Sequence, residues 1–432
     1  MWGLVPYAQY HFLNVIAESG GGLEHDNSTL MLSSRWSFRD KRRYQRWLGL
    51  VSHEFFHTWN IRRLRPRSLA EYDYENENYF EELWVAEGVT SYYDDLALVR
   101  AGLTSPKEYL SALSRQITSL QTTEGRLRQS LADSSFDAWI KYYRTNENSR
   151  NTTISYYTKG AVVAFLLDME IRRRTDGDKS LDDLMRSLYD EFAGKQGYTN
   201  ADVLAEANKL AGEDLSDWFE DAIFSTNELK YNHAMEWLGL RIGDAPDPTA
   251  TTGDSAEAGG SGEAGEKPAP DAAAANSKDA NGKGVTADTQ GVAPETPTKP
   301  TGPLWTGIGT RTEDGRTVVS SITEGSPGFE AGVNVDDELI ALNSYRIGDS
   351  LTSRLEPFNK DSYATLLISR RGKLLEIELP IKRRSPTSWA LKKLANPSDE
   401  QTANFRAWLR IVEEPQATPN KKDDAPSSKS SN

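Results

Sequence analysis

The sequence contains no cysteine, which excludes disulfide bonds and zinc sites built from thiolates. Any bound transition metal must therefore be held by nitrogen and oxygen atoms. Histidine is also scarce, since the 432 residues include only five. Basic residues are too few to balance the acids, and the net charge of −14 argues against non-specific binding of nucleic acid.

A long apolar run is missing as well. The most apolar stretch, GAVVAFLLDME, is far shorter than the roughly 20 residues that a membrane-spanning helix needs. The first residues, MWGLVPYAQYHFLNVI, have neither a basic region nor a small-residue cleavage site, so they do not predict a signal peptide. We expect a soluble protein of the cytoplasm or periplasm. The compartment stays open, because the natural N-terminus can lie upstream of Met1.

Composition divides the chain into parts. Short β-prone runs in residues 1–35 precede helical patterns from about 41 to 228, which predicts a small mixed sheet against a helical lobe. Residues 243–302 lack aromatic residues, Leu, Ile and Met, and hold ten acids against four lysines, so we expect a disordered linker. The predicted parts are an α+β unit (1–230), a strand that could open the second domain (231–242), the linker (243–302), a β-rich domain (303–385), a helical segment (386–411) and a disordered tail (412–432).

Two of the five histidines lie together in VSHEFFHTWN, residues 51–60, in an HExxH pattern. On a helix, His53 and His57 share one face with their Cβ atoms about 5–6 Å apart, so both imidazoles can bind one zinc at about 2.0–2.1 Å. Glu54 lies beside that position, where it can take a proton from a water on the metal. The alternative is a surface helix with two solvated histidines, and a third ligand would decide between them.

Glu87, in LWVAEGVTSYYDDL, is the candidate third ligand, and 29 residues separate it from His57. A His, His, Glu set with one open position is typical of catalytic zinc. Taken alone, a carboxylate at a helix start is explained by the helix dipole. Seven residues later, Asp94 lies on the same helical face and could accept a hydrogen bond from a zinc-bound histidine. Asp95, Ser91 or a solvated acidic face are the alternatives for that role.

Three segments, HEFFHTWNIRRLRP, DYENENY and LWVAEGVTSYY, closely resemble the glycyl aminopeptidase family of zinc metallopeptidases. These enzymes are gluzincins with a thermolysin-like catalytic domain and a PDZ domain behind it. The resemblance implies an α+β fold, with a thermolysin-like mixed sheet and helical lobe, a disordered linker and a small PDZ-like β-barrel domain. It also implies one Zn²⁺ held by His53, His57 and Glu87, with Glu54 as the general base. Family members usually carry a β-rich N-terminal domain, whereas this chain begins inside the catalytic sheet.

Two further segments gain roles from the resemblance. SYYTKGA is similar to the Tyr-x-Lys-Gly-Ala segment of related aminopeptidases, which makes Tyr157 a hydrogen-bond donor to the oxyanion. Tyr156 is the alternative, because adjacent helix positions point about 100° apart and only one can face the metal.

The second of these segments, GGLEHDN, is similar to the motif that lies along the substrate in gluzincin aminopeptidases. The resemblance makes Glu24 the partner of the free α-amine of the peptide. Gly21 and Gly22 would allow the substrate backbone to approach closely.

The region from GPLWTGIGT to LPIKRR resembles a PDZ domain, which binds a C-terminal peptide as an added strand at a sheet edge. The loop for the terminal carboxylate would lie around Gly307 and Gly309. Asn343-Ser344 stands where Asp-Gly is common in the tight turn, and this departure weakens the case for peptide binding.

The predicted function is that of a zinc aminopeptidase that removes Gly or Ala from peptides with a free N-terminus. One alternative is a less selective zinc endopeptidase. Another is a PDZ scaffold whose peptidase lobe is weak because the N-terminal β-domain is absent. Neither a nucleic-acid partner nor a membrane span is expected.

Overall fold

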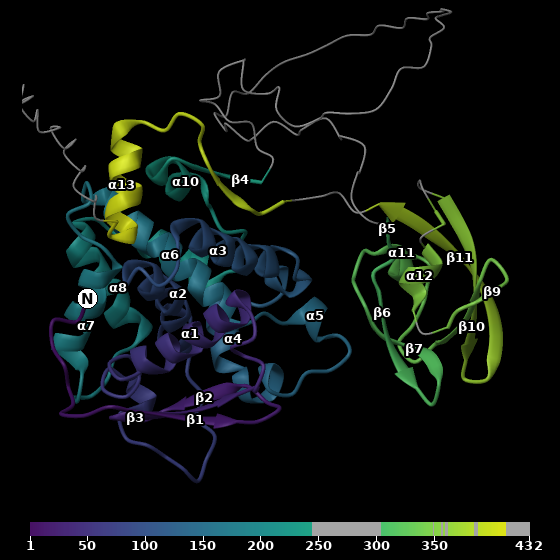
Figure 1. The fold of residues 1–432 in the computed structure, drawn as a ribbon, viewed down its shortest axis with the longest axis horizontal. Coiled ribbons are helices and arrows are strands. Elements are labelled where there is room, and N and C mark those ends of the chain that lie inside the picture. Colours follow the sequence, from purple (N-terminus) through teal and green to yellow (C-terminus); the bar gives the residue numbers. More distant parts are fainter. Residues whose placement is uncertain (244–303, 349, 356, 359–361, 384–387, 412–432) are drawn as a thin grey trace, which may run out of the picture. The chain divides into compact units, whose positions relative to one another are not determined.

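The computed structural model describes residues 1–243, 304–348, 350–355, 357–358, 362–383 and 388–411, and these form two compact units (Figure 1). The first unit mixes helices and strands and holds residues 1–243 and 388–411. The second is β-rich and holds most of residues 304–383. The fold class is therefore α+β, as predicted. The predicted linker beyond Gly243 and the tail from 412 lie outside the described residues.

A three-stranded sheet opens the first unit, formed by β1 (His11–Ile16), β2 (Gly21–Glu24) and β3 (Ser28–Ser33). β3 is central, parallel to β1 and antiparallel to β2. Within this sheet β2 is an edge strand, so one row of its backbone groups is not used for pairing with β3. The side of the sheet that carries Met31 of β3 is buried, and α1 packs against β2 and β3.

Helix α1 (Lys41–Phe56) carries the HExxH pattern in its last turns. Its start is fixed by Asp40, whose side chain accepts a hydrogen bond from the backbone N–H of Arg43 at 2.9 Å. The lobe is built around α6 (Tyr156–Arg174), which is buried on almost every side and packs against a π-helix, η2 (Trp84–Val89). Two glycines permit this approach, since a Cβ on Gly88 would lie 2.5 Å from the Cα of Gly160.

The π-helix continues directly into α2 (Thr90–Arg100), so one helical rod carries both Glu87 and Asp94. The other helices of the lobe are α3 (Pro106–Gln121), α4 (Leu131–Phe136), η4 (Ala138–Tyr142), α5 (Ser149–Thr152), α7 (Leu181–Phe192), α8 (Asn200–Ala211), α9 (Ser216–Phe219), η5 (Glu220–Phe224) and α10 (Asn232–Leu238), with short 3₁₀ turns η1 (Arg67–Leu69) and η3 (Glu124–Leu127).

The chain returns to the first unit after the β-rich one. β4 (Leu240–Ile242) pairs antiparallel with β12 (Leu391–Lys393), and α13 (Asp399–Leu409) packs against α10 and α2. The interpretation of residues 231–242 as a strand of the second domain was therefore wrong. This segment is α10 followed by β4. Its strand β4 pairs with β12, which lies about 150 residues later in the sequence, and no local pattern links the two strands.

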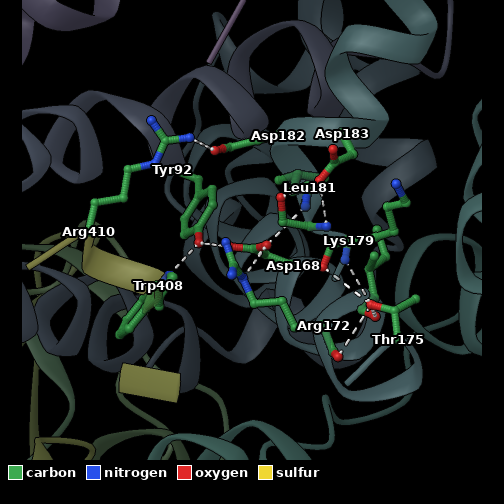
Figure 2. A network of polar contacts seen from close by, with 12 residues as sticks. Tyr92, Asp168, Arg172, Thr175, Lys179, Leu181, Asp182, Asp183, Trp408 and Arg410 are labelled. Carbon is green, nitrogen blue, oxygen red and sulfur yellow. Dashed lines mark hydrogen bonds and ion pairs between the residues drawn. The ribbon is translucent and has the colours of Figure 1, made fainter. Parts of the chain in front are cut away.

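Buried polar contacts hold α13 in place (Figure 2). Trp408 is fully buried, and its indole N–H donates to the Tyr92 hydroxyl of α2 at 2.8 Å. Tyr92 in turn donates to Asp168 of α6 at 2.6 Å, and Arg410 pairs with Asp182 of α7 at 2.7 Å. The C-terminal segment is thus an integral part of the first unit, because its removal would take the contacts of Trp408 and Arg410 away from two buried side chains of the lobe.

The second unit is a sheet of seven strands, six of which follow the order β5-β11-β10-β8-β7-β6, while β9 pairs with β8. Its hairpin from β10 to β11 turns at Arg371-Gly372, and both residues have positive φ. The elements are β5 (Leu304–Trp305), β6 (Ile308–Glu313), β7 (Arg316–Ile322), α11 (Pro327–Glu330), β8 (Glu338–Leu342), β9 (Tyr345–Arg346), α12 (Leu351–Leu355), β10 (Ser362–Arg370) and β11 (Lys373–Arg383).

Candidate metal and peptide site

The two histidines of the HExxH pattern lie side by side at the end of α1. His53 is in the last turn, His57 follows the helix, and their rings are 4.7 Å apart and nearly perpendicular. His57 is 2% exposed. Residues four apart on a helix lie on the same face, and the structure shows that both rings therefore meet on one side of α1.

Glu87 completes this group from the π-helix η2. Its Oε2 lies 3.2 Å from His53 Nε2 and 3.2 Å from His57 Nε2. A tetrahedral zinc with bonds of 2.0–2.1 Å keeps its ligand atoms about 3.3 Å apart, so the three donors fit such an ion. Burial alone would raise the pKa of Glu87, but the two histidines outweigh burial and hold that pKa below its ordinary value. The carboxylate is therefore ionised, as a metal ligand must be.

The other ring nitrogen of each histidine is already used. His57 Nδ1 donates to the backbone oxygen of Asn60 at 3.0 Å, and His53 Nδ1 lies 3.4 Å from Asp94 Oδ2. These contacts fix the ring orientations and leave both Nε2 atoms for a metal. Among the alternatives raised by the sequence, Asp94 is the residue that contacts His53.

Glu54 lies beside the three donors and is 4% exposed. Its Oε2 has no hydrogen-bond partner among the residues that the structure describes, which is rare for a buried oxygen. Burial raises the pKa of Glu54 to about 7. A carboxylate with such a pKa suits a group that takes up and returns a proton near neutral pH.

Strand β2 covers Glu54. Gly22 lies so close to its carboxylate that a methyl group on Gly22 would overlap it, whereas Gly21, with φ of 126°, borders open space. One carboxylate oxygen of Glu24 lies within 4.8 Å of ligand atoms of both Glu54 and His57. The predicted substrate motif is thus brought next to the candidate metal site.

Tyr157 and Tyr156 occupy different positions at the start of α6. The ring of Tyr157 lies 6.2 Å from that of His53 and is partly exposed. Tyr156 is buried, with its hydroxyl 2.9 Å from that of Tyr143. Burial, followed by Glu87, raises the pKa of Tyr157 above its ordinary value, so its phenol remains a hydrogen-bond donor. Of the two tyrosines, Tyr157 is the one beside the donors.

Two residues of this region were missed in the sequence. Asn60 contacts both metal-ligand segments, and Tyr143 places its hydroxyl 3.5 Å from that of Tyr157. Asn60 stands four residues after the HExxH helix, and its side chain contacts a segment 25 residues later in the sequence, so no local pattern marks it. Tyr143 lies in a separate segment, and no spacing rule links it to the site.

The contact between Gly22 and Glu54 leads to a first prediction. Gly22→Ala is expected to displace the Glu54 carboxylate and lower peptidase kcat/KM about 100-fold, since a shift of about 1 Å in a reacting group can cost that much. Bound metal should not change, because no ligand moves. Gly20→Ala is the matched control, since nothing lies within 4 Å of that position. Equal activities of the two variants would show that Glu54 has room to adjust.

Comparison with known proteins agrees with this geometry. Residues 46–163 match the model of the M61 glycyl aminopeptidase family. The crystal structure of an aminopeptidase N family protein from Idiomarina loihiensis has a TM-score of 0.72 and 28% identity, over 94% of this chain and 62% of that one. Residues 46–163, which include the HExxH pattern, Glu87 and Tyr157, are thus similar to the M61 glycyl aminopeptidase family. The chain spans less than two thirds of the length of the Idiomarina protein.

Two further structures are much less similar to this chain. Yeast LTA4 hydrolase in complex with bestatin has a TM-score of 0.34 and 14% identity, over 53% of this chain and 35% of that one. An HtrA-type protease with a decapeptide has a TM-score of 0.18 and 11% identity, over 19% and 30%. Such low scores carry no argument about fold or function. The curated proteins contain no match to the chain.

The remaining predicted positions lie in the β-rich unit. Gly307 has φ of 73° and precedes β6, where Gly309 is the second residue. β6 is an edge strand in the described part of this sheet. Peptide binding at these glycines stays a prediction. Within the described ranges, no helix combines the length and apolarity needed to cross a bilayer.

Proposed function

We propose that this chain is a zinc-dependent aminopeptidase that removes small N-terminal residues, glycine or alanine, from peptides. The observation that carries the proposal is the convergence of His53 Nε2, His57 Nε2 and Glu87 Oε2 at spacings that suit one zinc ion. The match of residues 46–163 to the M61 glycyl aminopeptidase family supports peptidase chemistry. The ion, the residue specificity and the mechanism are parts of the proposal.

His53, His57 and Glu87 would hold the ion. When bound, zinc supplies Lewis-acid polarisation of the scissile carbonyl and lowers the pKa of a coordinated water. The chain's own residues then decide how the proton and the developing charge are handled.

Glu54 is the proton acceptor in this proposal. Its buried Oε2 has no competing partner among the described residues, so it is free to take a proton from the attacking water. The same carboxyl group would return that proton to the leaving amine. Tyr157 would donate its O–H to the oxygen that becomes negative as the tetrahedral intermediate forms. Tyr143 is near enough to Tyr157 to restrict the movement of its phenol.

β2 would bind the peptide backbone. As an edge strand it can pair with an extended peptide, and the peptide's α-ammonium would then meet Glu24. Because Glu24 lies close to Glu54 and His57, there is little room between the ammonium site and the reacting carbonyl. This short distance favours release of a single residue.

Metal analysis combined with hydrolysis of glycyl and leucyl chromogenic amides tests the function. We expect about one zinc per chain, faster hydrolysis of the glycyl amide, and loss of activity on chelation that added zinc restores. A protein that binds zinc without cleaving either amide, or any longer peptide, would contradict the proposal. A catalytically weak peptide-binding scaffold would give that result.

Glu24 separates an aminopeptidase from an endopeptidase. Glu24→Ala is expected to lower kcat/KM for glycyl amides about 10–100-fold, because it removes the partner of the substrate ammonium. Acetylated peptides have no such ammonium, so their cleavage should change little. The control is His25→Ala, which alters the next side chain, an exposed one. If both substrate classes lose the same factor, Glu24 has only a structural role and the enzyme is a less selective endopeptidase.

A further inference from the structure

Asn60 is a buried residue at the point where the two metal-ligand segments meet. It follows the HExxH helix by four residues and is completely inaccessible to solvent. Neither the HExxH pattern nor the position of Glu87 assigns a role to it. Its backbone oxygen contacts the histidine segment, and its side chain contacts the segment that carries Glu87.

The first contact orients His57. The backbone oxygen of Asn60 accepts the Nδ1–H of His57 at 3.0 Å, and a carbonyl oxygen can only accept. The contact keeps the hydrogen on Nδ1 and directs Nε2, the atom 3.2 Å from Glu87 Oε2, to the proposed metal position. A shift of the Asn60 backbone would release this ring.

The side chain makes the second contact. Asn60 Nδ2 lies 2.8 Å from the oxygen of Val85 and 3.1 Å from that of Ala86, the two residues that precede Glu87. It also lies 3.0 Å from Thr90 Oγ1, at the start of α2. The three acceptors lie within three residues of Glu87 on both sides. The Asn60 amide therefore fixes the backbone that carries this ligand.

The backbone around Asn60 is held under strain. Ile61 has φ of 94°, a value that β-branched residues seldom adopt. Two hydrogen bonds close the turn, from Ile61 N to Leu64 O and from Leu64 N to Trp59 O, both at 2.9 Å. Strain of this kind persists only where the surroundings fix the conformation. The turn therefore presents Asn60 in one fixed position.

We propose that Asn60 is a positioning residue that sets the distance between the histidine pair and Glu87, and so the affinity of the site for its metal. The inference rests on the proposed zinc site and deepens it. Asn60 does not touch the metal or the peptide, and it acts through His57 and Glu87. Without its amide, the oxygens of Val85 and Ala86 lose a buried donor and the π-helix can move away from α1.

The test is the zinc affinity of the metal-free full chain, measured by competition with a chromogenic chelator. Asn60→Asp keeps the shape but replaces the donor with a charged acceptor, and Asn60→Ala removes the side chain. Both are expected to bind zinc about 10–100-fold more weakly than the wild type, the usual effect of losing a residue that orients metal ligands. The visible absorption of the cobalt-substituted protein should change as well, because the ligand geometry changes.

Gln121→Glu is the matched control. Gln121 is another buried amide of the same unit, but its Nε2 donates to the Tyr231 hydroxyl at 3.0 Å. This substitution should lower the melting temperature without altering zinc affinity or the cobalt spectrum. If Asn60→Asp does not fold, Asn60→Ala and the milder Thr90→Val, which removes one acceptor, give the same comparison.

Zinc affinity at the wild-type level in a folded Asn60 variant would overturn the inference, and so would an equal loss in Gln121→Glu. Failure of the proposed function gives a different result. A wild type that binds zinc but cleaves no peptide refutes the peptidase, while the affinity comparison still decides the role of Asn60. A wild type that binds no zinc refutes both.

Discussion

Glu54→Gln is expected to lower kcat about 10²–10⁴-fold while the protein keeps its metal, because the substitution removes a proton acceptor and no ligand. Glutamine has nearly the same shape, so it fits under Gly22 as Glu54 does. Its amide cannot take a proton from water. Substrate affinity should change little, since Glu54 acts on the attacking water and not on the bound peptide.

The same substitution at Glu87 should have the opposite effect on metal. Glu87→Gln replaces an ionised ligand 3.2 Å from both histidine Nε2 atoms with a neutral one, so bound zinc is expected to fall. Metal content by atomic spectroscopy and kcat, both measured on the two variants, give the comparison. Loss of metal from Glu54→Gln, or full metal in Glu87→Gln, would contradict the assigned roles.

Tyr157→Phe is expected to lower kcat about 10²–10³-fold with little change in KM, the usual cost of losing one oxyanion donor. The phenol is protonated, and its ring lies 6.2 Å from that of His53. Because the ring stays in place, metal binding should not change.

Tyr156→Phe is the matched control for this prediction. It removes a hydroxyl from the adjacent residue, which is buried, and that hydroxyl contacts the exposed Tyr143. We expect a modest loss of stability and nearly normal kcat. If Tyr156→Phe shows the large effect and Tyr157→Phe does not, the oxyanion donor is Tyr156.

Helical periodicity was enough to bring His53 and His57 together, because i and i+4 positions on any helix share a face. The α+β class could also be predicted, since strand-like and helix-like patterns occupy separate parts of the first unit. Glu87 was placed by resemblance, and its π-helical backbone had no local signal in the sequence. The π-helix packs closely against α6 where Gly88 meets Gly160, a contact between segments about 70 residues apart that no local pattern reveals.

Other features depended on contacts between distant segments. The close approach of Gly22 to Glu54 joins positions 32 residues apart, and the pairing of β4 with β12 joins positions about 150 apart. Neither contact has a periodic pattern that a single sequence can reveal. The assignment of residues 231–242 failed for this reason, since a short strand does not indicate its partner.

The pairing of Ile242 with Leu391 has a consequence for how the chain can vary in length. In the first unit, this pairing joins the two ends of the segment that connects β4 to β12. The entropic cost of such a loop rises by only about 0.6 kcal/mol each time its length doubles. Shortening it to a turn of a few residues, about five halvings, would therefore gain the unit only about 3 kcal/mol. A twofold change in the length of the insert therefore alters the stability of the first unit by less than about 1 kcal/mol, so a module can be lengthened or exchanged there without rebuilding the rest of the unit.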